Sequence, residues 1–315
     1  MHLSPPILVH MSQKISSPKV LCRPAGESDY PDITEFCKNI WDGHDYVPEV
    51  WHRWFSDPNG LFATAEYDGH AIGCSHLALL AEGQWWLEGF RVDPEHQGLK
   101  VGSRLHDYVT DWWGEHCDGT LRLMTNSKNV AVHHLCERTG YVKTFEVIGY
   151  EALPLDEPVE NIAPIADIRE ALKFALASES LQLTGNRVDL GWRICTLDEH
   201  IIRNFSSETA DYVHTFYWWK GKQGLFSVWD DEEDDTRTLV IGVLACALED
   251  IPSLLMDIRR LAAQKKCDEL FQIIFDLPQI VSQTEAGGFT KHWEHSAFIF
   301  EKRHPVRMVG ESLTR

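Results

Sequence analysis

A loop with two glycines separates an apolar strand from a long amphipathic helix, and this feature most restricts the fold. We expect the strand at 84–92 and the helix at 100–116, where apolar side chains recur at helical spacing. The loop between them runs from Gln97 to Ser103. The first amides of a helix lack intrahelical partners and, with the helix dipole, attract anions. Because Gly98 and Gly102 carry no side chain, the sequence predicts a phosphate cradle at this junction.

The first half of the chain alternates between strand-like and helix-like stretches. Asp68-Gly69 lies between two apolar runs and is a strong hairpin signal. We expect strands at 20–23, 61–67, 71–80, 84–92, 120–125 and 143–151, and helices at 29–39, 49–55, 100–116 and 129–138. This order predicts an α/β (α+β) fold, with helices packed on a mixed, mostly antiparallel sheet.

The second half repeats the last part of this order. We expect strands at 224–229, 238–247, 268–275 and 295–302, and helices at 252–266 and 278–285. Prolines among acidic residues indicate a linker between the halves. We therefore expect a flexible leader without a signal-peptide core, a first domain, a linker and a degenerate second copy of that domain, at 1–19, 20–151, 152–167 and 168–315.

The charge and the cysteine content of the chain restrict the classes of binding partner and the cellular compartment that we expect. The chain has 29 Lys and Arg against 48 Asp and Glu, and a formal charge of −19 disfavours phosphate backbones and anionic membranes. We therefore expect a cationic or zwitterionic small molecule rather than nucleic acid or a membrane. No apolar run approaches the roughly 20 residues that span a bilayer. The eight Cys are scattered singly, which indicates reduced thiols and predicts a cytoplasmic protein.

Two motifs carry a resemblance to a known family. The run from Gln97 to Gly102, after a strand that ends Val-Asp-Pro, resembles the pyrophosphate-binding signature of the GNAT N-acetyltransferases. Asn129, a following helix and Gly140-Tyr141 match a second element of that family in spacing. Lys100 departs from the pattern, because the family usually has its central glycine there. The resemblance implies tandem GNAT-like domains, the second degenerate, and an acetyl-CoA-dependent N-acetyltransferase.

The resemblance also implies the contacts with the coenzyme. It places them on Phe90, Arg91, Val92, Gln97, Gly98, Leu99, Lys100, Val101, Gly102, Ser103 and Asn129. Cys136 stands where the family has a tyrosine that protonates the leaving thiolate, so the usual acid is missing. A thiol is a weaker candidate for this role, and packing as a small core residue is the favoured interpretation of Cys136. Asn129 has a helix cap as its alternative interpretation.

Glu88 is the candidate general base. It lies four residues before Val92, on the same face of the strand, and is flanked by aromatic residues. We expect partial desolvation to raise its pKa toward the working pH. Gly89 predicts a bulge that frees amides for the thioester oxygen. A solvent-facing strand glutamate is the equal alternative for Glu88.

The acceptor is expected to bind against the loop at 43–48. His44, Asp45 and Tyr46 are the candidate residues, with Asp45 pairing a substrate ammonium, Tyr46 forming a wall and His44 relaying protons. As a string, residues 42–48 and 88–92 resemble the histidine N-acetyltransferase subfamily. That resemblance implies free histidine as the leading acceptor. Capping by Asp45 and packing of Tyr46 remain alternatives.

Three functions stay open. The first is acetyl transfer to a small amino acid or related metabolite; the second is a non-catalytic acyl-CoA-binding or regulatory module; the third is a peptide N-terminal acetyltransferase. The stretch 249–254 occupies the cradle position of the second half without a glycine, so we expect no CoA there. His133 and His134 have no partner at a metal-binding spacing, so no metal is expected. A homodimer is compatible with the sequence.

Overall fold

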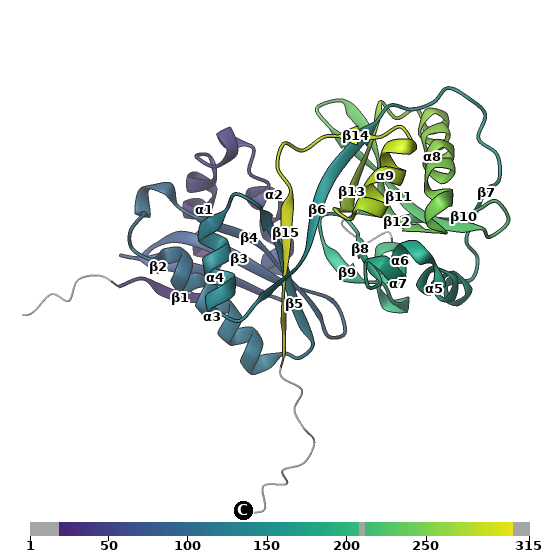
Figure 1. The fold of residues 1–315 in the computed structure, drawn as a ribbon. Coiled ribbons are helices and arrows are strands. Elements are labelled where there is room, and N and C mark those ends of the chain that lie inside the picture. Colours follow the sequence, from purple (N-terminus) through teal and green to yellow (C-terminus); the bar gives the residue numbers. More distant parts are fainter. Residues whose placement is uncertain (1–18, 208–211, 305–315) are drawn as a thin grey trace, which may run out of the picture.

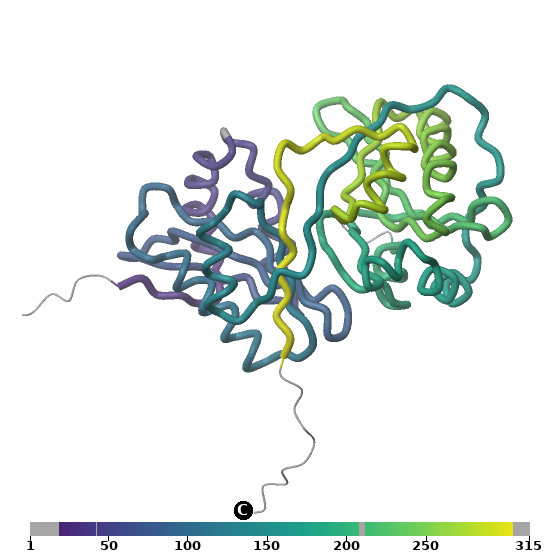
Figure 2. Tube along the Cα trace, viewed as in Figure 1, coloured from purple at the N-terminus to yellow at the C-terminus, as the bar shows by residue number. Residues whose placement is uncertain are grey.

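The computed structural model describes residues 19–207 and 212–304, which form two lobes (Figures 1 and 2). The leader expected at 1–19 lies outside the described residues except for its last one. The first half of the chain contains strands β1 (Leu21–Pro24), β2 (Leu61–Tyr67), β3 (His70–Ala81), β4 (Gln84–Val92), β5 (Thr120–Asn126) and β6 (Val142–Ala152), and helices α1 (Tyr30–Cys37), α2 (Val47–Phe55), α3 (Val101–His116) and α4 (Val130–Arg138).

The second half contains strands β7 (Ile162–Pro164), β8 (Arg187–Asp189), β9 (Ile194–Thr196), β10 (Thr215–Trp219), β11 (Gly224–Glu233), β12 (Thr236–Ala245), β13 (Glu269–Phe275), β14 (Thr290–Lys291) and β15 (Ala297–Arg303), and helices α5 (Ile168–Ala177), α6 (Glu179–Leu183), α7 (Glu199–Phe205), α8 (Ile251–Lys265) and α9 (Pro278–Ala286). Every element expected here is present at nearly the same residues. β11, expected to end at Trp229, instead extends through the acidic run to Glu233.

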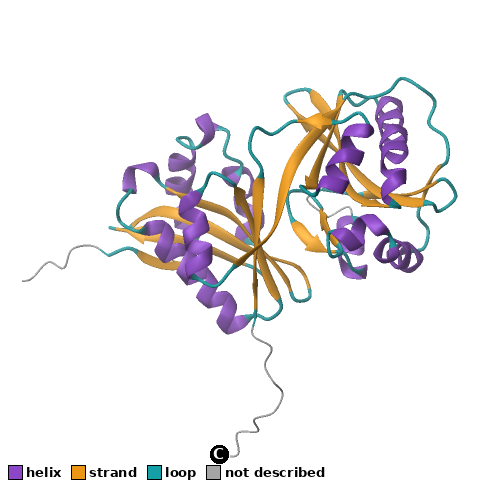
Figure 3. Ribbon diagram, in the orientation of Figure 1, coloured by secondary structure: helices purple, strands orange, loops and turns teal. Residues whose placement is uncertain are grey.

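One sheet runs through both lobes. Its strand order is β1-β2-β3-β4-β5-β15-β6-β13-β12-β11-β10-β7, with β14 paired to β6. Neighbouring strands are antiparallel except for the pairs β4–β5 and β12–β13. Helices lie on the faces of this sheet (Figure 3). The expected mixed, mostly antiparallel sheet flanked by helices is confirmed.

Local sequence explains the first lobe. Asp68 and Gly69 adopt φ angles of +52° and +85°, the left-handed conformations that the expected two-residue hairpin requires. Along α3, Leu105, Val109 and Trp113 lie on one face and are fully buried against the sheet. Each such side chain contributes roughly 1.5–3 kcal/mol on burial. This packing fixes α3, and therefore the loop before it, on the sheet.

The late strand β15 belongs to the sheet of the first lobe. It lies between β5 and β6, and Ala297 is opposite both Asn126 and Val147. In Figures 1 and 2 the yellow β15 runs beside the teal strands of the first half. On its other side β6 pairs with β13, so the two halves share strands. The sequence places 295–302 with the second half, and nothing in its pattern predicts this exchange.

The segment expected as a linker contains a strand. β7 pairs with β10, with Ala163 opposite Trp218, and so closes the far edge of the sheet. Its prolines are tolerated because the sheet ends at this strand. The chain between the halves therefore takes part in the second lobe.

Candidate functional site

β4, the strand that carries Glu88, separates from β5 part-way along its length and contains a bulge. β4 pairs with β5 only over Gln84–Trp86, and the described partner of its remaining residues is β3. Two residues of β4, Gly89 and Phe90, face the single residue Ser75 of β3. The bulge predicted at this glycine is confirmed. It opens the sheet between β4 and β5, directly before the loop that leads to α3.

The loop before α3 has the geometry of an anion cradle. A short 3-10 helix, Pro94–His96, follows β4, and residues 97–100 are exposed. Gly98 and Lys100 have φ angles of +86° and +58°. The first hydrogen bond of α3 joins the Arg104 amide to the Lys100 carbonyl at 3.0 Å. The amides of residues 101–103 therefore have no intrahelical acceptor and project from the positive end of the helix.

Lys100 has a left-handed backbone, a conformation that favours glycine. Its left-handed backbone costs a residue with a side chain roughly 1–2 kcal/mol relative to glycine. The loop nevertheless keeps this conformation with lysine, so the departure from the family pattern changes a side chain and not the turn. Gly102 packs against the end of β4, because a Cβ placed on it would lie 3.7 Å from the side chains of Phe90 and Val92. This packing holds the start of α3 next to β4.

Glu88 lies at the junction of the two lobes and is paired with a residue of the second one. Its side chain is only 10% exposed. Arg193, which precedes β9, donates two hydrogen bonds to its carboxylate, at 3.0 and 2.9 Å. His76 Nδ1 lies 3.0 Å from Glu88 Oε1 on the neighbouring strand. Glu88 is therefore neither solvent-facing nor isolated.

The expected raised pKa of Glu88 is wrong. Burial does raise it, as the sequence predicts, but the Arg193 charge and the hydrogen bonds from His76 and Arg193 outweigh burial and lower the pKa to about 2. Glu88 is an ionised carboxylate at neutral pH. As it stands, it can attract a cation but cannot itself hold a proton efficiently.

His76 extends this cluster toward a second carboxylate. Its Nε2 lies 3.4 Å from Asp57 Oδ2, and the imidazole holds the pKa of Asp57 below its ordinary value. The ring stacks on Trp54 with centroids 4.7 Å apart. A Cβ on Gly89 would lie 2.3 Å from the same indole, so Trp54 positions both the imidazole and the bulge. Imidazole is the side chain that exchanges protons most readily near neutral pH.

Asp45 does not lie free for a substrate ammonium, as the sequence analysis expected. Its carboxylate is fully buried and accepts hydrogen bonds from Arg91 at 2.6 and 3.2 Å and from the Val47 amide at 3.1 Å. The Arg91 guanidinium also lies over the Trp41 ring, 4.1 Å from its centroid. Asp45 and Arg91 therefore fasten the loop at 43–48 to β4. Arg91, expected at the coenzyme, is directed to this loop.

The other two loop candidates are exposed. Tyr46 contacts the edge of Trp54, with ring centroids 6.0 Å apart, beside the Glu88 cluster. Its position fits the expected wall of an acceptor site. His44 is exposed, and its ring makes no hydrogen bond or ion pair with any residue that the structure describes, so no proton relay is seen there.

Asn129 and Cys136, the two candidates at α4, have the features of a helix cap and of a core residue. Asn129 caps the helix, and its side chain accepts from the Val132 amide at 3.3 Å. Cys136 is fully buried in the core of the first lobe, and burial raises the pKa of its thiol to about 12. Both observations favour capping and packing. The remaining candidates, Leu99 and Val101, belong to the cradle, where Leu99 is exposed and Val101 buried.

Sequence reasoning missed Arg193, His76 and Asp57. The sequence carries a partial signal for His76. The Glu82-Gly83 turn predicts the β3–β4 hairpin, but its regular register would place Leu77 opposite Glu88, and an irregularity between Leu79 and Ala81 brings His76 there instead. Arg193 gave no signal, since it is far from Glu88 in sequence and reaches it only through the packing of the two lobes.

In the part of the chain that the structure describes, no helix is long and apolar enough to cross a membrane. Within the same residues, no group of three or more His, Cys, Asp and Glu is placed to hold a metal ion.

Comparisons with known proteins match part of the first half of the chain. Residues 29–141 match the Acetyltransferase (GNAT) family. The chain is 29% identical over 85 residues to histidine N-acetyltransferase of Xenopus tropicalis, and 28% identical over 87 residues to probable N-acetyltransferase 16 of Homo sapiens. Each match covers 27% of this chain, and 26% and 24% of the two relatives. The chain thus matches about a quarter of the length of these relatives.

Solved structures extend the likeness to both lobes. A GCN5-related N-acetyltransferase from Sphaerobacter thermophilus superposes with a TM-score of 0.60 at 13% identity, covering 90% of this chain and 95% of that one. A tandem GNAT protein from the clavulanic acid biosynthesis pathway gives 0.56 at 11% identity, covering 91% and 99%. At these identities the likeness shows the fold, which is that of tandem GNAT proteins.

Proposed function

From the premise that residues 29–141 form a domain of the Acetyltransferase (GNAT) family, we propose that the protein is an acetyl-CoA-dependent N-acetyltransferase. Its acceptor is the primary amine of a small amino acid or related metabolite, with histidine as the leading candidate. The observation that carries the proposal is the exposed, left-handed loop at the N-terminus of α3, beside the opening between β4 and β5.

The cradle is suited to the pyrophosphate of the coenzyme. The main-chain amides of Gln97–Ser103 would donate to phosphate oxygens, and the open space around Gly98 lets a phosphate approach the backbone. Phe90 and Val92, which lie against Gly102, would continue the site along β4. The amides of the bulge would stabilise negative charge on the thioester oxygen.

The Glu88 cluster is suited to a zwitterionic acceptor. An acceptor ammonium that displaces the Arg193 guanidinium meets a carboxylate that is already ionised. The displaced guanidinium is then available to the carboxylate of the same acceptor, so the charges in this buried site stay balanced. The exchange supports a free amino acid as the acceptor.

The proton that the ammonium must lose has a route through the same cluster. Glu88 orients the ammonium. In the tautomer that carries its proton on Nε2, beside Asp57, His76 accepts the ammonium proton at Nδ1, directly or through water. Asp57 stabilises the resulting imidazolium. The amine then forms the new C–N bond as the C–S bond of the thioester breaks. Since Cys136 is buried, the leaving thiolate takes its proton from solvent.

A thiol-release assay with free amino acids, amines and peptides tests this proposal. We expect turnover on free amino acids, histidine among them. Coenzyme binding without turnover on any amine would instead identify a non-catalytic module. Turnover on peptides alone would identify a peptide N-terminal acetyltransferase.

Glu88→Gln tests the site within that assay. We expect turnover to fall by on the order of 100-fold, while affinity for the coenzyme stays the same, because the change lies away from the cradle. Glu82→Gln is the matched control, since Glu82 is an exposed carboxylate at the turn of the same hairpin. Unchanged turnover in Glu88→Gln would remove Glu88 from the mechanism.

A further inference from the structure

The second lobe has its own opening in the sheet, and a cavity lies in it. β12 and β13 run parallel only from Thr238 to Ile241 and from Glu269 to Gln272, and then separate as β4 and β5 do. Residues beyond this point, Gly242, Leu244 and 273–275, line the cavity together with α6, β8 and α9. The cavity thus occupies the place in the second lobe that corresponds to the proposed site in the first.

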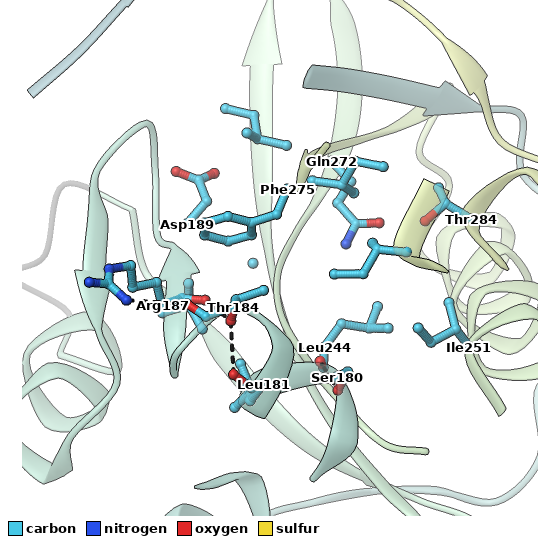
Figure 4. Close-up of a pocket in the computed structure, with 15 residues that line it drawn as sticks. Ser180, Leu181, Thr184, Arg187, Asp189, Leu244, Ile251, Gln272, Phe275 and Thr284 are labelled. Carbon is cyan, nitrogen blue, oxygen red and sulfur yellow. Dashed lines mark hydrogen bonds between the residues drawn. The ribbon is translucent and has the colours of Figure 1, made fainter. Parts of the chain in front are cut away.

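Two buried acceptors at this cavity have no hydrogen-bond partner among the described residues. They are Asp189 Oδ1 and Gln272 Oε1, on residues that are 3% and 6% exposed. Figure 4 shows both side chains among those surrounding the cavity. Two hydroxyls of the lining already have partners: Ser180 donates to the Leu244 carbonyl, and Thr184 shares its hydroxyl proton between the Leu181 and Arg187 carbonyls. Unmatched buried acceptors are rare and costly, so they point to a missing donor.

We propose that this cavity binds a small primary ammonium ligand with a short aliphatic body. An ammonium supplies hydrogen-bond donors to an unmatched acceptor, and its charge matches the carboxylate of Asp189. The rest of the lining is largely aliphatic and includes Leu244, Ile251 and Ile280, which suits an alkyl body.

The size and the charges of the cavity agree with this ligand. About 50 Å³ is open to the centres of water molecules. At roughly 10–15 Å³ for each water, this accommodates an organic ligand of about four or five non-hydrogen atoms. The only guanidinium of the lining, Arg187, is paired with both Glu301 oxygens, at 2.6 and 3.0 Å, and lies at the edge of the group in Figure 4. Glu249 and Asp250 directly precede α8, and their negative charges disfavour a phosphate at the N-terminus of this helix.

The ionisation of Asp189 gives the proposal a distinctive signature. Burial raises the pKa of Asp189 to about 8, against hydrogen bonds from the Trp192 and Arg193 amides that lower it. An ammonium that pairs with this carboxylate must therefore release a proton at pH 7. The other titratable groups around it do not interfere: burial lowers the pKa of His214 to about 3 and raises that of Cys195 far above neutral. Arg187 and Arg193 are both paired with glutamates.

Calorimetry of the full chain with n-propylammonium chloride, in buffers of different ionisation enthalpy, tests the proposal. We expect about one proton to be released per ligand at pH 7, and affinity to rise about tenfold from pH 6 to pH 7 before levelling above pH 8. Asp189→Asn should lose most of this affinity and all of its pH dependence. Tetramethylammonium chloride carries the charge without donors and should not bind.

The first lobe also has a proposed amine site, so the location must be established separately. Glu88→Gln should retain the proton-linked binding, and crystals soaked in n-propylammonium chloride should show the ligand between Asp189 and Gln272. Ordered water alone at that place, no proton release, equal binding of tetramethylammonium, or loss of the signal in Glu88→Gln would each overturn the proposal. If Asp189→Asn does not fold, proton release and the soaked crystal, both measured on the unmodified protein, still test the proposal.

Discussion

Replacing Arg193 by methionine removes the cation that holds Glu88 ionised and keeps a side chain of similar length. The two residues share hydrogen bonds of 3.0 and 2.9 Å, and the Glu88 side chain is 10% exposed. In the intact protein the pKa of Glu88 falls from its ordinary value of 4.5 to about 2. That difference corresponds to on the order of 3 kcal/mol of stability. It is fully present above pH 4.5 and is lost as the pH falls through about 2.

In Arg193→Met we expect burial to dominate and the pKa of Glu88 to rise. The free energy of unfolding at pH 7 should fall by about 3–5 kcal/mol, because a buried carboxylate has lost its main partner. The deficit should shrink on acidification, since protonation of Glu88 removes the unpaired charge. Urea denaturation of both proteins between pH 4 and pH 8 measures this difference.

The double variant Glu88→Gln with Arg193→Met supplies the control. It removes both charges, so it should recover much of the lost stability and make the difference from the intact protein less dependent on pH. A single Arg193→Met variant that loses less than about 1 kcal/mol, or whose deficit stays constant with pH, would refute the reasoning about this pair.

Three further substitutions test the cradle, the bulge and the missing acid. Lys100→Gly should stabilise the protein by up to roughly 1 kcal/mol in urea denaturation, because a φ of +58° suits glycine. Coenzyme affinity should stay unchanged, and a loss of affinity would show that the lysine side chain itself binds phosphate. Gly89→Ala should cost more than about 2 kcal/mol and abolish turnover, since its Cβ would lie 2.3 Å from Trp54 in a backbone with φ of +60°, and an active, stable variant would contradict this. Cys136→Ala should lower the melting temperature and retain most turnover, as a fully buried thiol is a packing residue; turnover lost without loss of stability would restore it as the acid.

Local patterns were sufficient to predict much of the first lobe. The apolar stripe of α3, the Asp68-Gly69 hairpin and the bulge at Gly89 each depend on residues close in sequence, and all are present. The pKa shift of Glu88 was predicted in the wrong direction. The aromatic neighbours that desolvate Glu88 are adjacent in the sequence, whereas the guanidinium that lowers its pKa is not. That partner, Arg193, depends on how the lobes pack.

The prediction that Asp45 is free to pair with a substrate ammonium also failed because its partner is distant in sequence. The sequence shows Asp45 in a polar loop, but its partner Arg91 lies on β4 and covers it completely. The roles of Asn129 and Cys136 remain predictions. Their capping and packing contacts were already the alternatives that helix-end and core chemistry suggest.

The place of β15 has a consequence for the synthesis of the chain. β5 acquires its second neighbour only when β15 has left the ribosome. At 5–20 residues per second, the interval after β6 emerges is roughly 8–30 s. Throughout that interval β5 presents an open edge, to which β6 or another nascent chain can pair. We therefore expect a nascent chain that stalls before β15 to misassemble in its first lobe, even though the whole of the proposed coenzyme cradle has already been made.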